Sequence, residues 1–125
     1  MSKKALVIED NGLVGETLKA MLEFLDFEVV VVEDGYKAQE KFKSAVESNN
    51  PFDVVFVDLV LPEIPGSEIF KKLKEIDPHI KAVISSGYSD DTSIKEYEKL
   101  GFKGVLNKPY TIEELKEVLK KLDLL

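Results

Sequence analysis

Cysteine is absent from this chain of 125 residues, and histidine occurs only once. The lack of cysteine excludes a disulfide framework and a thiolate metal site. No apolar run approaches the roughly 20 residues that a membrane-spanning helix needs. Residues 1–4 lead straight into a predicted strand and contain no apolar segment of the kind found in secretory signals. These absences favour a cytoplasmic protein without membrane insertion.

Basic residues are outnumbered, with 17 Lys and Arg against 24 Asp and Glu, and the net charge is -7. Because nucleic-acid backbones are bound by basic patches, we expect no direct nucleic-acid binding by this chain. The single histidine, His79, follows Asp77-Pro78 in a predicted turn, and we interpret it as a surface residue. Hydrophobic residues make up 44% of the chain, which is enough for one core, so we assign residues 1–125 to a single domain.

Five short apolar runs rich in β-branched residues alternate with five helical patterns. Such alternation predicts an α/β fold with one parallel sheet whose strands are buried on both faces. The predicted strands cover residues 4–9, 28–32, 53–57, 80–84 and 104–107. The predicted helices cover residues 13–26, 36–48, 66–76, 90–100 and 112–123.

Four polar residues stand at or just beyond the ends of four of these runs: Asp10, Asp58, Ser86 and Lys108. Parallel sheets bind ligands beyond the carboxyl ends of their strands, so we expect the four side chains to converge there. Two acids, a hydroxyl and an ammonium suit a divalent cation together with a phosphoryl group. Glu9 adds a third carboxylate, and a cation would relieve the repulsion among the three. Oxygen ligands beside a phosphoryl group indicate Mg²⁺.

The chain resembles the receiver domain of two-component response regulators over nearly its whole length. The matching segments are Leu6-Val7-Ile8-Glu9-Asp10, Asp58-Leu59-Val60-Leu61-Pro62 with Gly66, Val83-Ile84-Ser85-Ser86-Gly87, and Gly104-Val105-Leu106-Asn107-Lys108-Pro109. Each segment alone is a weak signal, but four in order, each at a strand end, form a specific pattern. The resemblance implies a flavodoxin-like, doubly wound sheet of five parallel strands in the order 2-1-3-4-5, with five flanking helices.

The resemblance also implies a role for each site residue. Asp58 would accept the phosphoryl group, and Lys108, followed by a cis peptide bond to Pro109, would contact a phosphoryl oxygen. Ser86 would donate its hydroxyl to the same group. Ser85 is the competing serine, but the register favours Ser86, because Gly87 then occupies the small position that follows it.

For Mg²⁺, the resemblance implies that Asp10 and Asp58 are ligands, together with the backbone carbonyl of Val60, and that Glu9 acts mainly through water. One position departs from the family. Three residues before Lys108, the family commonly has Tyr or Phe, whereas this chain has Val105. The usual aromatic switch is therefore absent or rerouted. Tyr88 is a candidate substitute, but we interpret it first as a partly exposed loop residue.

The leading hypothesis is a phosphorelay signalling switch. A sensor histidine kinase or a histidine phosphotransfer protein would supply the phosphoryl group, and phosphorylation would change binding to a downstream protein. The chain would catalyse its own phosphorylation and dephosphorylation at Asp58 without turning over a free substrate. One alternative is a receiver-like binding module that acts without phosphorylation. Another is an aspartyl-nucleophile phosphohydrolase, although such enzymes commonly carry a second Asp where this chain has Val60.

Overall fold

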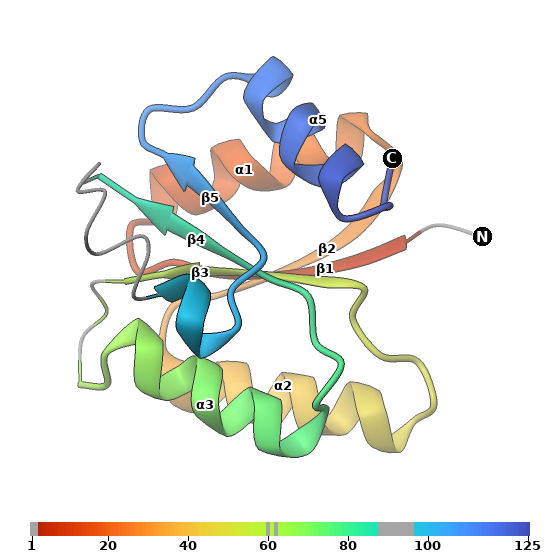
Figure 1. Ribbon diagram of the computed structural model, residues 1–125, viewed down its shortest axis with the longest axis vertical. Coiled ribbons are helices and arrows are strands. Elements are labelled where there is room, and N and C mark those ends of the chain that lie inside the picture. The colour runs from red at the N-terminus through yellow and green to blue at the C-terminus, as the bar shows by residue number, and fades with distance from the viewer. Residues whose placement is uncertain (1–2, 60, 62, 88–96) are drawn as a thin grey trace.

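The computed structural model describes residues 3–59, 61, 63–87 and 97–125, apart from the side chain of Ser86. The elements that it describes are β1 (Lys3–Ile8), α1 (Gly12–Phe24), β2 (Phe27–Val32), α2 (Gly35–Glu47), β3 (Val54–Asp58), α3 (Gly66–Ile76), β4 (Ala82–Ser86), β5 (Gly104–Asn107) and α5 (Ile112–Lys121). Figure 1 shows the sheet at the centre, with α1 and α5 covering one face and α2 and α3 the other.

All four strand pairings are parallel, and the strand order is β2-β1-β3-β4-β5. This order confirms the predicted doubly wound sheet. The carboxyl ends of the strands therefore meet at one edge, on the left of Figure 1, and both chain termini lie at the opposite end. The register places Asp58 opposite Ser85, and Ser86 opposite Asn107.

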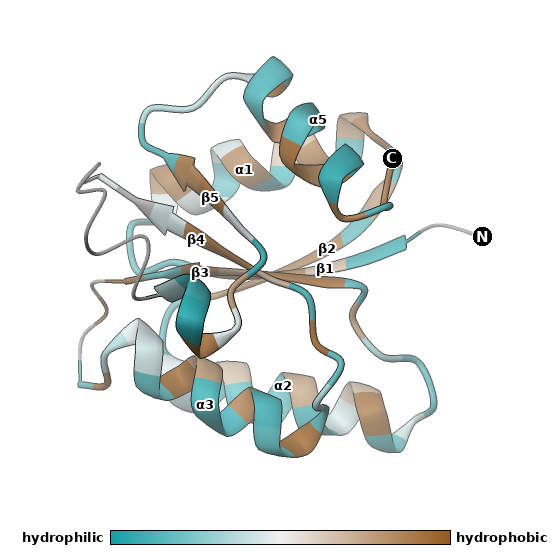
Figure 2. Ribbon diagram, in the orientation of Figure 1, coloured by the Kyte–Doolittle hydropathy of each residue, from teal (hydrophilic) through white to brown (hydrophobic). Residues whose placement is uncertain are grey.

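Alternate residues along each strand supply two separate cores, one on each face of the sheet. In Figure 2 much of the sheet is brown, and the helices on both sides alternate between brown and teal segments. The core under α2 and α3 includes Leu6, Ile8, Val55, Val57, Phe42, Phe70 and Ile84. The core under α1 and α5, which we call the α1/α5 core, includes Val7, Leu18, Leu22, Phe56, Val83, Leu106, Leu115 and Leu119. Burial of apolar area on both faces fixes the register, because a shift of one residue would turn each strand's side chains to the wrong face.

Local signals set the ends of the helices. The Asn11 and Asp34 side chains accept backbone N–H groups at the starts of α1 and α2. Thr111 and Glu114 form a capping box that begins α5, as their spacing indicates. Gly101, at φ 114°, follows a helical segment over residues 97–100. That segment is the end of the helix predicted at 90–100, and the rest of this prediction lies outside the described residues.

Four of the five strands begin or end one or two residues away from their predicted bounds, and β5 keeps its predicted bounds. β1 ends at Ile8 and not at Glu9, although the Glu9 N–H still donates to the Val32 carbonyl at 3.0 Å. β4 covers Ala82–Ser86 and not 80–84, because Ser85 and Ser86 pair with neighbouring strands. Ile80 is buried before the strand begins. Ser85 and Ser86 therefore extend β4 beyond the end that the hydrophobic pattern predicts.

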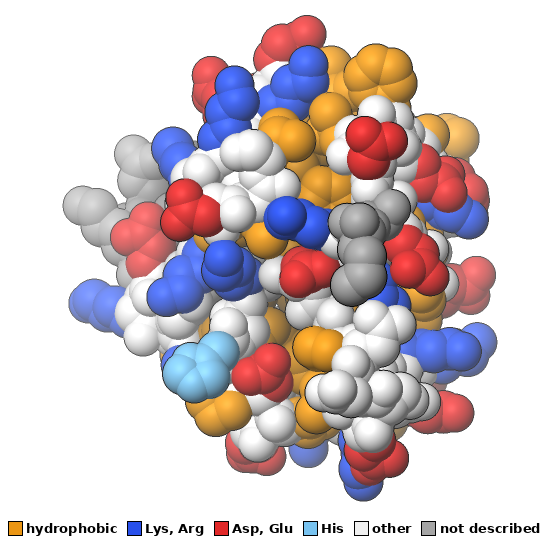
Figure 3. Space-filling model, turned by 90° about the vertical axis from the view of Figure 1, so that its right-hand side faces the viewer, with side chains coloured by type: hydrophobic (Ala, Val, Ile, Leu, Met, Phe, Trp, Pro, Cys, Tyr) orange, Lys and Arg blue, Asp and Glu red, His pale blue; other side chains and the backbone are white. Residues whose placement is uncertain are grey.

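In the part of the chain that the structure describes, no helix combines the length and the apolar character needed to cross a membrane. Figure 3 views the molecule from the amino-terminal ends of the strands. Acidic and basic side chains are interspersed over this face, with the single histidine, His79, among them. His79 is exposed, which agrees with its interpretation as a surface residue.

Candidate functional site

The carboxyl edge of the sheet brings together four of the predicted site residues. Asp58 is the last residue of β3, and Glu9 and Asp10 directly follow β1, the neighbouring strand. Lys108 directly follows β5. Glu9 and Asp58 are buried, whereas Asp10 is exposed. The parallel sheet thus places three acids and one base from distant parts of the sequence at a single edge.

The three carboxylates form a compact cluster. One oxygen atom from each of Glu9, Asp10 and Asp58 lies within 4.8 Å of the others. Three anionic groups at this separation repel one another unless a cation or a proton compensates. An all-oxygen donor set with one exposed member suits a hard divalent cation that keeps part of its water shell. The predicted convergence of the acids is therefore observed.

Lys108 supplies the compensating charge from the protein itself. Its Nζ lies 2.6 Å from Glu9 Oε1 and 3.2 Å from Asp58 Oδ2. The backbone N–H of Asn11 donates to the other Glu9 oxygen, Oε2, at 3.2 Å. Glu9 is thus bound directly by Lys108, a contact that sequence reasoning, which assigned Glu9 a role through water, did not predict.

The protonation of Glu9 is finely balanced. Burial, followed by the neighbouring Asp58 side chain, raises the pKa of Glu9 from 4.5 to about 7, while Lys108 and the Asn11 N–H oppose this rise. Burial lowers the pKa of Lys108, but Glu9 and the charge of Asp58 outweigh that effect, and the net change is upward. Lys108 therefore carries its charge at neutral pH. Because the pKa of Glu9 is close to neutral, its carboxyl group can either keep a proton or lose it to a bound cation.

Two backbone features fix the surroundings of Asp58. The Lys108–Pro109 peptide bond is cis, as predicted. The chain after β3 returns over Asp58, where the Gly66 N–H donates to the Leu59 carbonyl at 3.3 Å. A Cβ atom at Gly66 would lie 3.0 Å from Leu59 Cα and closer still to the carbonyl oxygen of Asp58. Only glycine can lie this close to the backbone of Asp58 and Leu59 without displacing it.

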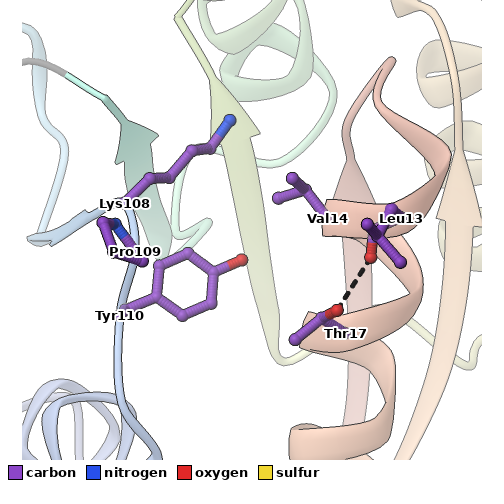
Figure 4. A pocket seen from close by; sticks show the side chains of 6 residues that line it. All are labelled: Leu13, Val14, Thr17, Lys108, Pro109 and Tyr110. Atoms are coloured by element: carbon purple, nitrogen blue, oxygen red, sulfur yellow. Dashed lines mark hydrogen bonds between the residues drawn. The ribbon is translucent and has the colours of Figure 1, made fainter.

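A pocket of about 350 Å³ opens beside Lys108, between α1 and the segment after β5. Its walls are Leu13, Val14 and Thr17 on one side and Lys108, Pro109 and Tyr110 on the other, as Figure 4 shows. The Thr17 hydroxyl is held by its own helix, donating to the Leu13 carbonyl at 2.8 Å. Leu13 is 79% exposed. An apolar surface thus adjoins the charged cluster.

Sequence reasoning did not identify two polar neighbours of the site. Ser85 is buried, although it was considered only as a competitor of Ser86, and Tyr110 is half-buried against the α1/α5 core. Tyr110 follows Lys108 by two residues, and this spacing was the available signal. Of the other predictions, the backbone of Ser86 lies at the end of β4. The Ser86 side chain, Val60 and Tyr88 lie outside the described residues.

This geometry supports a defined set of chemical roles. A buried carboxylate in contact with an ammonium can act as a nucleophile toward an electrophile whose negative charge the ammonium neutralises. The neighbouring acids can hold a divalent cation that adds to this neutralisation. Phosphoryl transfer requires mainly such positioning and charge compensation, and little covalent assistance from the protein.

Comparisons with known proteins agree with this arrangement. The transcriptional regulatory protein CrdR of Helicobacter pylori is 29% identical over 97% of this chain, which spans 55% of CrdR, about half of that relative's length. The sporulation initiation phosphotransferase F of Bacillus subtilis is 27% identical over 97% of this chain and 94% of its own length. A CheY-like response regulator receiver domain from Methylobacillus flagellatus is 29% identical, with a TM-score of 0.78 over 98% of this chain and 99% of that structure.

The family model described as the response regulator receiver domain matches residues 5–120. The match includes most of β1, Asp58 at the end of β3, and Lys108 after β5, so it covers every residue of the cluster described above. The chain therefore belongs to the receiver-domain family of two-component response regulators.

Proposed function

We propose that this chain is a phosphorylation-controlled switch that accepts a phosphoryl group on the Asp58 carboxylate. The observation that carries the proposal is the contact of Asp58 with Lys108 inside a cluster of acids. Asp58 is 6% exposed, and its Oδ2 lies 3.2 Å from Lys108 Nζ. An incoming phosphoryl group would bring oxygens that the ammonium can contact while the carboxylate attacks phosphorus.

Mg²⁺ is the proposed cofactor, held by Asp10 and Asp58 and by the Val60 carbonyl, with Glu9 contributing directly or through water. The donor set fits, because it consists of carboxylate oxygens alone and contains a buried acid, Glu9, whose pKa is raised to about 7. Bound Mg²⁺ would neutralise charge on the transferring phosphoryl group. It would also relieve the repulsion among the acids that otherwise favours a proton on Glu9.

The proposed phosphoryl donor is a sensor histidine kinase or a histidine phosphotransfer protein, acting in the cytoplasm on a single domain over residues 1–125. The family supports a donor of this class, and one relative is named a phosphotransferase. Lys108 would contact the bound phosphoryl group from β5, and the Ser86 hydroxyl would contact it from β4. Phosphorylation would then shift the population of two surface states and so change binding to a downstream protein.

The output differs from the family's common mechanism at one position. Val105 is partly buried and packs against the core under α2 and α3, where it carries no ring or hydroxyl that could change rotamer in response to the site. Ser86 would therefore have to transmit the signal without an aromatic partner at position 105. If a partner bound equally well with and without phosphorylation, the chain would instead be a phosphorylation-independent binding module.

Beryllofluoride, a mimic of a carboxylate-bound phosphoryl group, provides the test. We expect it to bind with Mg²⁺ and to shift backbone NMR resonances around Asp58 in the wild type and not in Asp58→Asn. Asp26→Asn is the matched control, since Asp26 is exposed at φ 69°, a conformation that asparagine tolerates. Identical spectral changes in Asp58→Asn would overturn the assignment of Asp58.

A further inference from the structure

A buried hydroxyl beside Asp58 lacks a well-formed hydrogen bond. Ser85 is only 4% exposed, and its Oγ has no hydrogen-bond partner among the described residues. A buried polar group left unpaired costs about 1–3 kcal/mol, so alanine would be the less costly residue at this position if packing were the only requirement. The serine therefore needs an explanation in terms of its neighbours.

The sheet register shows which face Ser85 occupies. Ser85 is paired with Asp58 on one side and with Leu106 on the other. Residues in register on neighbouring strands direct their side chains to the same face. Leu106 belongs to the α1/α5 core, so the Ser85 hydroxyl lies on that face, next to the strand position of Asp58.

Tyr110 reaches the same place from the segment after β5. Its ring packs against the α1/α5 core. Burial raises the pKa of the Tyr110 phenol, and an interaction with the Ser85 hydroxyl lowers it. The two hydroxyls are therefore neighbours, although their alignment falls short of a well-formed hydrogen bond. Figure 4 shows Tyr110 and Lys108 extending from the same short segment.

We propose that Ser85 and Tyr110 are positioning residues for Lys108, their paired hydroxyls holding the segment after β5 so that the ammonium stays between Asp58 and Glu9. This inference rests on the proposed function, because Lys108 is placed for phosphoryl transfer to Asp58. The segment is anchored at two points. Lys108 binds the acids on β3 and after β1. The Tyr110 hydroxyl is a neighbour of Ser85 on β4, the strand that pairs with β3 beside Asp58.

The ring and the hydroxyl of Tyr110 have different roles in this proposal. The ring forms part of the pocket wall and of the core contact, and phenylalanine would preserve both. Removal of the hydroxyl alone would leave Ser85 without its polar neighbour and would loosen one anchor of the segment. A small displacement of Lys108 then lowers the rate of phosphoryl transfer, since misplacement by about 1 Å can cost up to about a hundredfold.

A double-mutant cycle of Ser85→Ala and Tyr110→Phe tests this coupling, with acetyl phosphate as the donor and Mg²⁺ present. We expect each single variant to lower the maximal phosphorylation rate at least about threefold, within the range that misplacement allows. We expect the double variant to be no slower than the slower single one. The half-saturating donor concentration should stay unchanged, and Ser85→Thr should keep the wild-type rate. Tyr36→Phe and Ser44→Ala, which remove exposed hydroxyls, are the controls.

A second measurement requires no phosphorylation. The 15Nζ resonance of Lys108, identified by its loss in Lys108→Arg, should shift in Ser85→Ala and in Tyr110→Phe and stay in place in both controls. If the wild type takes up no phosphoryl group, the proposed function fails, but this resonance still decides whether the hydroxyl pair positions Lys108. An unmoved resonance, or rate effects that simply add in the cycle, would overturn the inference.

Discussion

The Nζ atom of Lys108 lies 3.2 Å from Oδ2 of Asp58, although 50 positions separate the two residues in the chain. The contact exists because β5 and β3 are parallel strands of one sheet whose carboxyl ends meet at the same edge. Lys108 also binds Glu9, so one ammonium stabilises two buried acids. The stability and reactivity of the site therefore depend on the Lys108 ammonium and on the acids around it.

The first prediction concerns the substitution Asp58→Asn. It removes the nucleophile, keeps the shape and removes one negative charge from the cluster, while Lys108 retains Glu9 as a partner. We expect loss of phosphorylation with equal or slightly higher thermal stability in the absence of Mg²⁺. Because Asp58 helps to raise the pKa of Glu9, that pKa should fall in the variant, as carboxyl NMR titration can measure. An unfolded variant would contradict this account of the cluster.

The second prediction is a dependence of stability on pH without Mg²⁺. The pKa of Glu9 is about 7 in the folded chain against 4.5 for an ordinary glutamate, so the folded state binds the proton more tightly. The free energy of unfolding should therefore fall as pH rises from about 4.5 to about 7. For one proton, the slope reaches at most about 1.4 kcal/mol per pH unit. Urea titrations of the wild type and Glu9→Gln should show that the substitution flattens this slope.

The third prediction is that Mg²⁺ raises the melting temperature, because it binds the folded cluster and not the dispersed acids. Asp10→Ala should remove most of this gain and Glu9→Ala less of it. Glu16→Ala, which removes an exposed acid from α1, should leave the gain intact and serves as the control. A wild-type melting temperature that does not respond to Mg²⁺ would be inconsistent with the metal site.

The fourth prediction compares two glycines. Gly66→Ala places a Cβ against the Asp58 backbone and should cost about 1–3 kcal/mol of stability, the usual range for overpacking. The same change should disturb phosphorylation, because the displaced backbone belongs to the nucleophile. Gly12→Ala is the matched control, since a Cβ there meets nothing within 4 Å. Chemical denaturation and phosphorylation rates of the two variants should therefore differ clearly.

The fold could be predicted from the sequence because the core strands are continuous apolar runs and the helices carry caps and buried stripes. The strand order came from the family resemblance and was confirmed, since hydrophobic patterns specify which face is buried and not which strands are neighbours. The end of β4 was misplaced. Ser85 and Ser86 are polar, and the pairing that keeps them in the strand involves residues far away in the sequence.

The acids and Lys108 could also be located, because each directly follows or ends a predicted strand. Their detailed contacts could not. The direct bond between Glu9 and Lys108 depends on side-chain length and burial across three strands. The meeting of Ser85 with Tyr110 depends on which face of the sheet each residue occupies, and that face becomes certain only when the register is known.

Phosphoryl uptake at Asp58 tests the central claim most directly. The purified chain, incubated with acetyl phosphate and Mg²⁺, should gain the mass of one phosphoryl group in intact mass spectrometry. Peptide mapping should place that group on Asp58. The gain should be absent in Asp58→Asn, strongly reduced in Lys108→Ala or after chelation of Mg²⁺, and unchanged in Asp26→Asn. No mass gain in the folded wild type, or a phosphoryl group mapped to another residue, would contradict the account.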